Sequence, residues 1–200
     1  MFRKMTTGEV YGLDISPGMI EKAKEQQKED DKEITYVVQD ASAPFKLSKE
    51  FDVVALTWLL AHSSGFEMTK AFLKNVYANL RPGGRVVSIG MLGKPYNDMV
   101  ELQKYGFYEI KYPQEVHDGI RDLREGDFAK VRILAPGLDL VLDDYWIPEE
   151  SFTRALEEVG FVNIKWHPLT LSPEWPGEKN YWDKFLEHSA HGFFTANKPE

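Results

Sequence analysis

Short apolar runs alternate with amphipathic segments along the chain. Val10–Ile15, Ile34–Val38 and Phe51–Leu60 are apolar or β-branched runs, which are typical of buried strands. A helix is predicted after the first run, because Ser16-Pro17 combines an N-cap residue with a first-turn proline. The third run is apolar at nearly every position, as a strand covered on both faces requires.

The pattern then changes to helical spacing. Apolar residues recur at every fourth position from 68 to 80, which predicts an amphipathic helix. The Arg-Pro-Gly-Gly sequence at 81–84 ends this helix, and a strand is predicted at 85–91. Alternating strands and helices predict an α/β, Rossmann-like fold with a mostly parallel sheet and helices on both faces.

The second half of the chain is less regular. Residues 93–136 are rich in Tyr, Phe and charge without a clean period, so we expect a helical or irregular cap inserted into a single domain of residues 1–200. Beyond it the pattern predicts a core strand at 138–147, a helix ending at Gly160, a strand at 162–171, a short helix at 181–188 and a last strand at 192–197.

Composition narrows the classes of partner. The 200 residues are 42% hydrophobic, enough for a core, and the net charge of −8 argues against nucleic acid or an anionic membrane surface. The sequence has no cysteine, which excludes disulfides and thiolate metal sites and fits a reducing compartment. No apolar run has the length of a secretory signal or a membrane span. We therefore expect a cytoplasmic protein.

Carboxylates follow two successive predicted strands. Asp14 ends the first strand, and Asp40 follows the second with Ala41 beside it. Ligands of open parallel sheets bind beyond the carboxyl ends of the strands. A carboxylate there can accept hydrogen bonds from a ribose diol or an adenine amine. The alternatives are a helix-capping Asp14 and a turn-forming Asp40.

Four segments in order resemble one family: YGLDISPGMI, YVVQDASAPF, FDVVALTWLL and LRPGGRVVSI. Together they are similar to the class I S-adenosylmethionine-dependent methyltransferases. From Trp146 onward the chain resembles that family's last strands and helix, including an antiparallel C-terminal hairpin. The ending YWDKFLEHSAHGFFTANK resembles small-molecule members, including toxoflavin-synthase-like methyltransferases. The resemblance implies S-adenosylmethionine as cofactor and a small-molecule methyl acceptor.

The same resemblance implies roles for individual residues. Asp14 would bind the ribose hydroxyls, and Asp40-Ala41 would recognise the adenine edge. Ile15 and Met19 would pack on the adenine, with plain core packing as the alternative. Thr57, at the end of the third strand, would border both the cofactor and the substrate.

The family's first unit, a strand followed by a Gly-x-Gly-x-Gly turn, is missing from this sequence. In the family that strand lies between the strand of Asp14 and the strand of Phe51–Leu60. Without it we expect either unpaired edges on both strands or direct pairing of the two in a new order. Three explanations stay open: a truncated sequence, a shortened homologue that has lost cofactor binding, or a strand supplied by another chain, either a second copy or a strand-donating partner.

The predicted function is methyl transfer from S-adenosylmethionine to a small molecule. One alternative is a catalytically inactive, methyltransferase-like partner or regulatory protein. A second alternative, a nucleotide-dependent reductase, is disfavoured because its glycine fingerprint is also absent.

Candidate catalytic and substrate residues lie beyond the third strand and in the cap. His62 is a candidate general base, with a loop or helix-capping role as the alternative. Trp58, Tyr105, Tyr108 and His117 are candidates for the wall of an acceptor pocket, with core packing as the alternative for the aromatic residues. No metal site is predicted, because no set of three ligands is evident.

Overall fold

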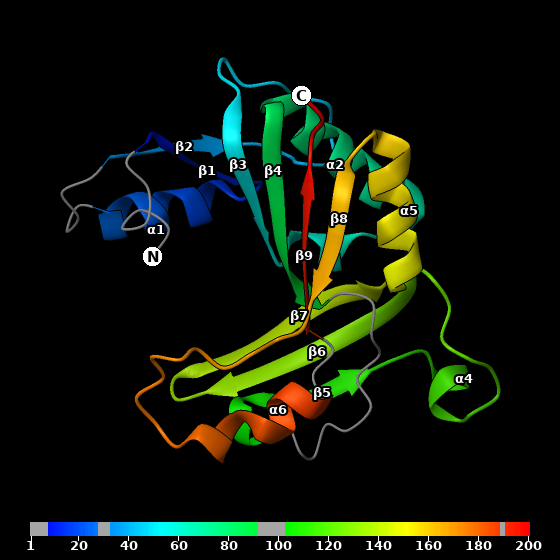
Figure 1. Ribbon diagram of the computed structural model, residues 1–200. Helices are drawn as coiled ribbons and strands as arrows, with labels where there is room; N and C mark the ends of the chain where they lie inside the picture. Colours follow the sequence, from blue (N-terminus) through cyan, green and yellow to red (C-terminus); the bar gives the residue numbers. More distant parts are fainter. Residues whose placement is uncertain (1–7, 28–32, 92–102, 189–190) are drawn as a thin grey trace. The chain divides into compact units, whose positions relative to one another are not determined.

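The computed structural model describes residues 8–27, 33–91, 103–188 and 191–200 (Figure 1). The chain divides into two compact units, Met1–Phe45 and Lys46–Glu200, each of which is described by itself. The prediction of one domain with a cap at 93–136 stays a prediction.

The first unit is a strand-helix-strand motif. Its described elements are β1 (Val10–Asp14), α1 (Pro17–Gln27) and β2 (Ile34–Val38). The two strands pair in parallel, with Asp14 opposite Val38. The helix begins as predicted, because the Met19 amide donates to the Ser16 hydroxyl at 3.3 Å.

The second unit contains two sheets. Its elements are β3 (Phe51–Thr57), η2 (Leu59–His62), α2 (Phe66–Asn79), β4 (Leu80–Met91), η3 (Gln103–Tyr105), β5 (Phe107–Lys111), α4 (Gln114–His117), β6 (Asp127–Ala135), β7 (Leu138–Trp146), α5 (Glu149–Val159), β8 (Val162–His167), η4 (Lys179–Trp182), α6 (Asp183–His188) and β9 (His191–Asn197). One sheet has the order β3-β4-β9-β8 and the other the order β5-β6-β7. Only β3 and β4 pair in parallel among the strands of this unit that the structure describes.

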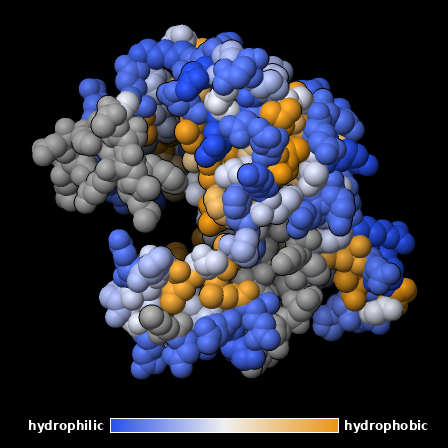
Figure 2. All heavy atoms as spheres, in the orientation of Figure 1, coloured by the Kyte–Doolittle hydropathy of each residue, from blue (hydrophilic) through white to orange (hydrophobic). Residues whose placement is uncertain are grey.

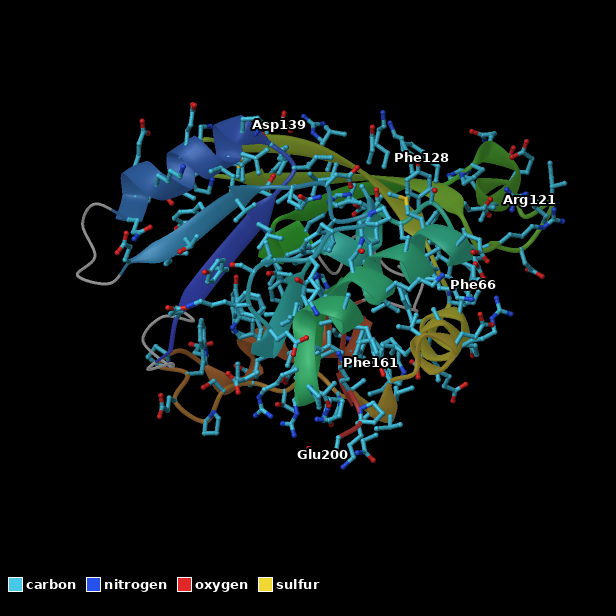
Figure 3. The ribbon with its side chains drawn as sticks, turned by 90° about the horizontal axis from the view of Figure 1, so that it is seen from above. Phe66, Arg121, Phe128, Asp139, Phe161 and Glu200 are labelled. Carbon is cyan, nitrogen blue, oxygen red and sulfur yellow. The ribbon has the colours of Figure 1, made fainter. Side chains whose placement is uncertain are left out.

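The main core lies between the four-stranded sheet and two helices. Helices α2 and α5 pack against each other, and they contact β4 and β8 respectively. Figure 3 shows Phe66 at the start of α2, close to α5, where the Arg154 guanidinium lies 3.9 Å from its ring centroid. Fully buried side chains here include Leu73, Leu80, Val86, Phe152, Leu156 and Phe194. Each such side chain contributes roughly 1.5–3 kcal/mol through burial.

The fold class predicted from the sequence is confirmed. The parallel pairs β1-β2 and β3-β4 and the antiparallel hairpin β8-β9 are present. The α5 helix ends as predicted at Gly160, whose φ of 103° is one that a residue with a side chain rarely adopts.

Four element predictions were wrong. The strand predicted to reach Leu60 ends at Thr57, because Trp58 takes a left-handed conformation with φ 64° and leads into η2. The strand after Gly160 ends at His167, just before Pro168, which has no amide hydrogen for a ladder. Residues 93–136, expected to be helical or irregular, contain the strands β5 and β6. The strand expected at 138–147 pairs with β6 rather than entering the main sheet.

The strands β1 and β3 each have one edge with no described neighbouring strand, which is one arrangement expected without the family's first unit. Within the described ranges, β1 pairs with β2 alone and β3 with β4 alone, in separate sheets. The face seen in Figure 2 is mostly hydrophilic, with apolar side chains gathered in separate patches. Among the described helices, none combines the length and apolarity needed to cross a bilayer.

Candidate functional site

The strand ends of the first unit bring two carboxylates to one edge. The Gln39 amide donates to the Asp14 carbonyl at 2.9 Å, which keeps the two strands paired up to their ends. Asp14 Oδ1 accepts a hydrogen bond from the Ser16 amide at 2.8 Å, while its Oδ2 has no hydrogen-bond partner among the described residues. Asp14 therefore caps a turn with one oxygen, and its other oxygen accepts no hydrogen bond from the described residues.

Asp40 is held by its own turn. Its Oδ1 accepts hydrogen bonds from the Ser42 amide at 2.8 Å and the Ser42 hydroxyl at 2.7 Å. These bonds, the side-chain one foremost, hold the pKa of Asp40 below its ordinary value. The carboxylate is consequently ionised at neutral pH, with the half-buried Ala41 next to it.

Two apolar side chains beside these carboxylates lie outside the core. Ile15 is 66% exposed and Met19 is 53% exposed. The alternative that these two side chains pack in the core is therefore wrong. The first unit thus joins two carboxylates to exposed apolar surface just beyond the carboxyl ends of its parallel strands. This combination of carboxylate acceptors and apolar surface fits a nucleoside, whose ribose needs hydrogen-bond acceptors and whose base needs apolar contact.

In the second unit, the end of β3 carries Thr57, Trp58 and His62. The Trp58 amide donates to the Ile89 carbonyl at 2.8 Å, which fixes the sharp turn against β4. A side chain at Gly90 would place its Cβ 3.3 Å from the Trp58 Cα, so the close approach favours glycine there. Both Thr57 and Trp58 are exposed.

His62 lies against β7. Its Nδ1 is 3.1 Å from Asp144 Oδ1 and 3.2 Å from the Asp143 carbonyl oxygen. The Asp143 contact has the geometry of a hydrogen bond, whereas Asp144 is an ion-pair partner whose Oδ1 is otherwise unpaired within the described residues. The nearby Asp144 carboxylate is the main reason why the pKa of His62 is raised above its ordinary value, against the opposing effect of burial.

Tyr105 belongs to an aromatic cluster rather than to an open pocket wall. Its ring stacks on Trp182 with centroids 5.0 Å apart, and its hydroxyl donates to the Tyr181 carbonyl at 2.6 Å. Phe185 links this group to His191, whose ring lies 4.9 Å from that of Trp58. The cap-core alternative therefore describes Tyr105 better than the pocket wall does. Burial among these rings lowers the pKa of His191 to about 4.

The other two cap candidates lie in β5 and at the end of α4. Tyr108 lies in β5, and its side chain is outside the described part of the structure. The His117 side chain is 79% exposed at the end of α4, and its ion pair is with Asp118. Figure 3 shows Arg121 beside this short helix and Phe128 on the strand β6 that follows. A hollow of about 320 Å³ on the three-stranded sheet contains none of the candidate residues.

Sequence reasoning missed Asp144 and His191. Asp144 is 2% exposed and lies far along the chain from His62. Only the three-dimensional pairing of β7 with η2 reveals it. No cluster of three or more His, Asp or Glu residues suited to a metal occurs in the described ranges.

Comparison with known proteins points to one family. Residues 1–88 match the family model described as a methyltransferase domain. A crystal structure of an S-adenosylmethionine-dependent methyltransferase from Mesorhizobium loti aligns with a TM-score of 0.63 at 16% identity, covering 98% of this chain and 82% of that one. The fold is that of the S-adenosylmethionine-dependent methyltransferases. The resemblance found in the sequence is thereby confirmed at the level of the fold.

Two curated relatives of this chain are named as methyltransferases. A demethylmenaquinone methyltransferase from Symbiobacterium thermophilum is 27% identical over 167 residues, covering 82% of this chain and 62% of the relative. Another, from Lactococcus lactis, is 39% identical over 85 residues, covering 42% of this chain and 32% of the relative. The chain thus spans between about a third and three fifths of the length of these relatives.

Proposed function

We propose that the chain binds S-adenosylmethionine and serves its transfer of a methyl group to a small molecule. The observation that carries the proposal is the strand-end site of the first unit, where two carboxylates lie beside exposed apolar side chains. The site falls inside the part of the chain that matches the methyltransferase family. The small-molecule acceptor is supported by the names of the two demethylmenaquinone methyltransferases among the relatives.

The roles of the residues follow from their chemistry. Asp14 Oδ2 accepts from the ribose hydroxyls, and Asp40 accepts from the adenine amine while the Ala41 amide donates to a ring nitrogen. Ile15 and Met19 cover the adenine, which buries their exposed surface. The bound cofactor supplies an activated methyl group. Catalysis by the protein then consists mainly of alignment and of proton removal from the acceptor.

Calorimetric titration with S-adenosylmethionine and S-adenosylhomocysteine tests the proposal. Asp14→Asn is the informative variant, since an amide oxygen still accepts from Ser16 while the charge and the free carboxylate oxygen are lost. Removing charge-assisted hydrogen bonds worth about 1.5–3 kcal/mol should weaken binding roughly 10- to 150-fold.

Asp52→Asn is the matched control, because this exposed carboxylate pairs with Arg81 outside the candidate site. Unchanged affinity in Asp14→Asn would refute the role of that residue. No binding by the folded wild-type chain would instead favour the catalytically inactive partner protein.

Thr57, Trp58 and His62 belong to the acceptor side of the proposal. They follow the parallel strand β3, at the strand end where ligands of parallel sheets bind. The edge of β3 that has no neighbour among the described strands supports an added strand from a second copy or a partner chain. The cysteine-free sequence supports a cytoplasmic location.

A further inference from the structure

The protonation pattern of the His62 ring follows from its neighbours. Its Nδ1 faces two oxygens, Asp144 Oδ1 at 3.1 Å and the Asp143 carbonyl at 3.2 Å. Both are hydrogen-bond acceptors, so the hydrogen of a neutral ring resides on Nδ1 and the lone pair on Nε2. Nε2 has no hydrogen-bond partner within the described residues, and the side chain is 48% exposed.

Asp144 is a buried carboxylate. It lies on the face of the three-stranded sheet that includes the buried Ala129 and Val131. The opposite face carries exposed charges such as Arg132 and Asp139. Burying a carboxylate is costly unless a cation or donor pairs with it, and His62 is the ion-pair partner that the described structure provides.

We propose that Asp144 is a positioning residue that holds His62 with Nε2 free to accept a proton, and that the pair serves a methyl acceptor whose reacting group is a hydroxyl. The second part rests on the proposed function and names the class of its substrate. A neutral hydroxyl is a weak nucleophile that gains reactivity when a base removes its proton. A neutral amine already offers a lone pair and needs no base before the transfer.

The proton balance of the step is simple. The acceptor's O–H bond breaks as its proton bonds to Nε2 of His62, and the oxygen forms the new bond to the methyl carbon. The electron pair of the former carbon–sulfur bond stays on the sulfur. The resulting imidazolium is stabilised by the Asp144 carboxylate on the other side of the ring.

Few other charged groups face this ring. The Asp143 side chain turns to Lys130, with Nζ and Oδ1 3.6 Å apart, and only its carbonyl faces His62. Strands β3 and β4, which also contact η2, contribute no ion pair to His62 in the described ranges. The titration of His62 therefore reports on Asp144.

Nuclear magnetic resonance of the whole chain tests the pairing without turnover. Histidine-labelled protein would be titrated from about pH 5 to 9, with the His62 signals assigned by their loss in His62→Gln. We expect the neutral ring to carry its hydrogen on Nδ1. We also expect Asp144→Asn to lower the titration midpoint of His62, because the opposing charge is removed.

Asp143→Asn is the matched control, since it keeps the backbone carbonyl and should leave the midpoint unchanged. A neutral ring with its hydrogen on Nε2, or an equal midpoint in Asp144→Asn, would overturn the assignment of Asp144. The result does not depend on cofactor binding, so it is distinct from a failure of the proposed function.

The acceptor class is tested with two matched probes, catechol and 1,2-phenylenediamine, by measuring S-adenosylhomocysteine release. We expect methylation of catechol, reduced at least tenfold in His62→Gln and Asp144→Asn. In Asp144→Asn the residual activity should begin at lower pH than in the wild type. Methylation of the diamine alone, equal rates in His62→Gln, or no turnover of either probe by chain that binds the cofactor would overturn the hydroxyl assignment.

Discussion

Two histidines near the same end of the four-stranded sheet have opposite electrostatics. His62 follows β3 and is half exposed, and a carboxylate raises its pKa. His191 opens β9 opposite Met91 and is 8% exposed, and burial among aromatic rings lowers its pKa to about 4. The two pKa values shift in opposite directions because the neighbouring groups differ, not because the two residues lie at different positions along the sheet. The Asp144 carboxylate favours the protonated form of His62, whereas burial keeps the His191 ring neutral at neutral pH.

The largest expected effect comes from Gly126, which lies between the loop after His62 and β7. Its amide donates to the Trp146 carbonyl at 2.9 Å, and a Cβ on it would be 2.8 Å from the Ser64 carbonyl. With φ at 83° as well, Gly126→Ala should cost about 2–5 kcal/mol of unfolding free energy, the sum of backbone strain and overpacking. It should also lower the His62 titration midpoint while sparing His191.

Gly137→Ala is the control for this prediction. Gly137 has a similar φ of 78° but no atom within 4 Å of the position of an added Cβ. Gly137→Ala should therefore lose only the unfolding free energy that backbone strain costs, about 1–2 kcal/mol. Chemical denaturation of both variants measures the difference. Equal losses would show that the contact with the His62 loop does not constrain the fold.

His191 should make the protein sensitive to acid. Its folded-state pKa of about 4 lies below the ordinary value of 6.5, so the unfolded state binds the proton more tightly. The stability gained by keeping His191 neutral is present above about pH 6.5 and is lost as pH falls toward 4, up to about 3 kcal/mol. As the pH falls through this range, the wild type should lose unfolding free energy relative to His191→Phe. Denaturation curves of both proteins at several pH values measure this change. A difference in unfolding free energy that does not change with pH would mean that His191 is more accessible to solvent than the structure shows.

The sequence predicted the local features of the candidate site but not the distant ones. Asp14 and Asp40 were found because each lies at or just after the end of a predicted strand, which is a local pattern. The structure adds that each accepts a hydrogen bond from the amide of a serine two residues further on. The Ser16 helix start and the Gly160 helix end are local in the same way. Exposure decided against core packing for Ile15 and Met19, whereas the capping and turn roles considered for Asp14 and Asp40 are present in the structure.

Features that depend on tertiary pairing were missed. Asp144 meets His62 only because β7 packs on η2, and no spacing in the sequence records that contact. The strand β6 has alternating apolar positions at Phe128 to Leu134, but its charged residues obscured the pattern within a region judged irregular. The aromatic cluster of Tyr105 likewise joins segments separated by more than 70 residues, since the Tyr105 hydroxyl bonds to Tyr181.

The smallest expected effect separates the two histidines by the sign of their pH dependence. The folded-state pKa of His62 is raised, so its pairing with Asp144 stabilises the protein fully below the unfolded-state pKa and is lost as pH rises through the folded-state value. Because the side chain is 48% exposed, the contribution should stay below about 1 kcal/mol. The unfolding free energies of wild type and His62→Gln, compared between about pH 5 and 9, should differ most at the acid end. A difference that grows toward alkaline pH would mean that Asp144 does not stabilise the protonated His62 ring, and the contrast with His191 would then rest on exposure alone.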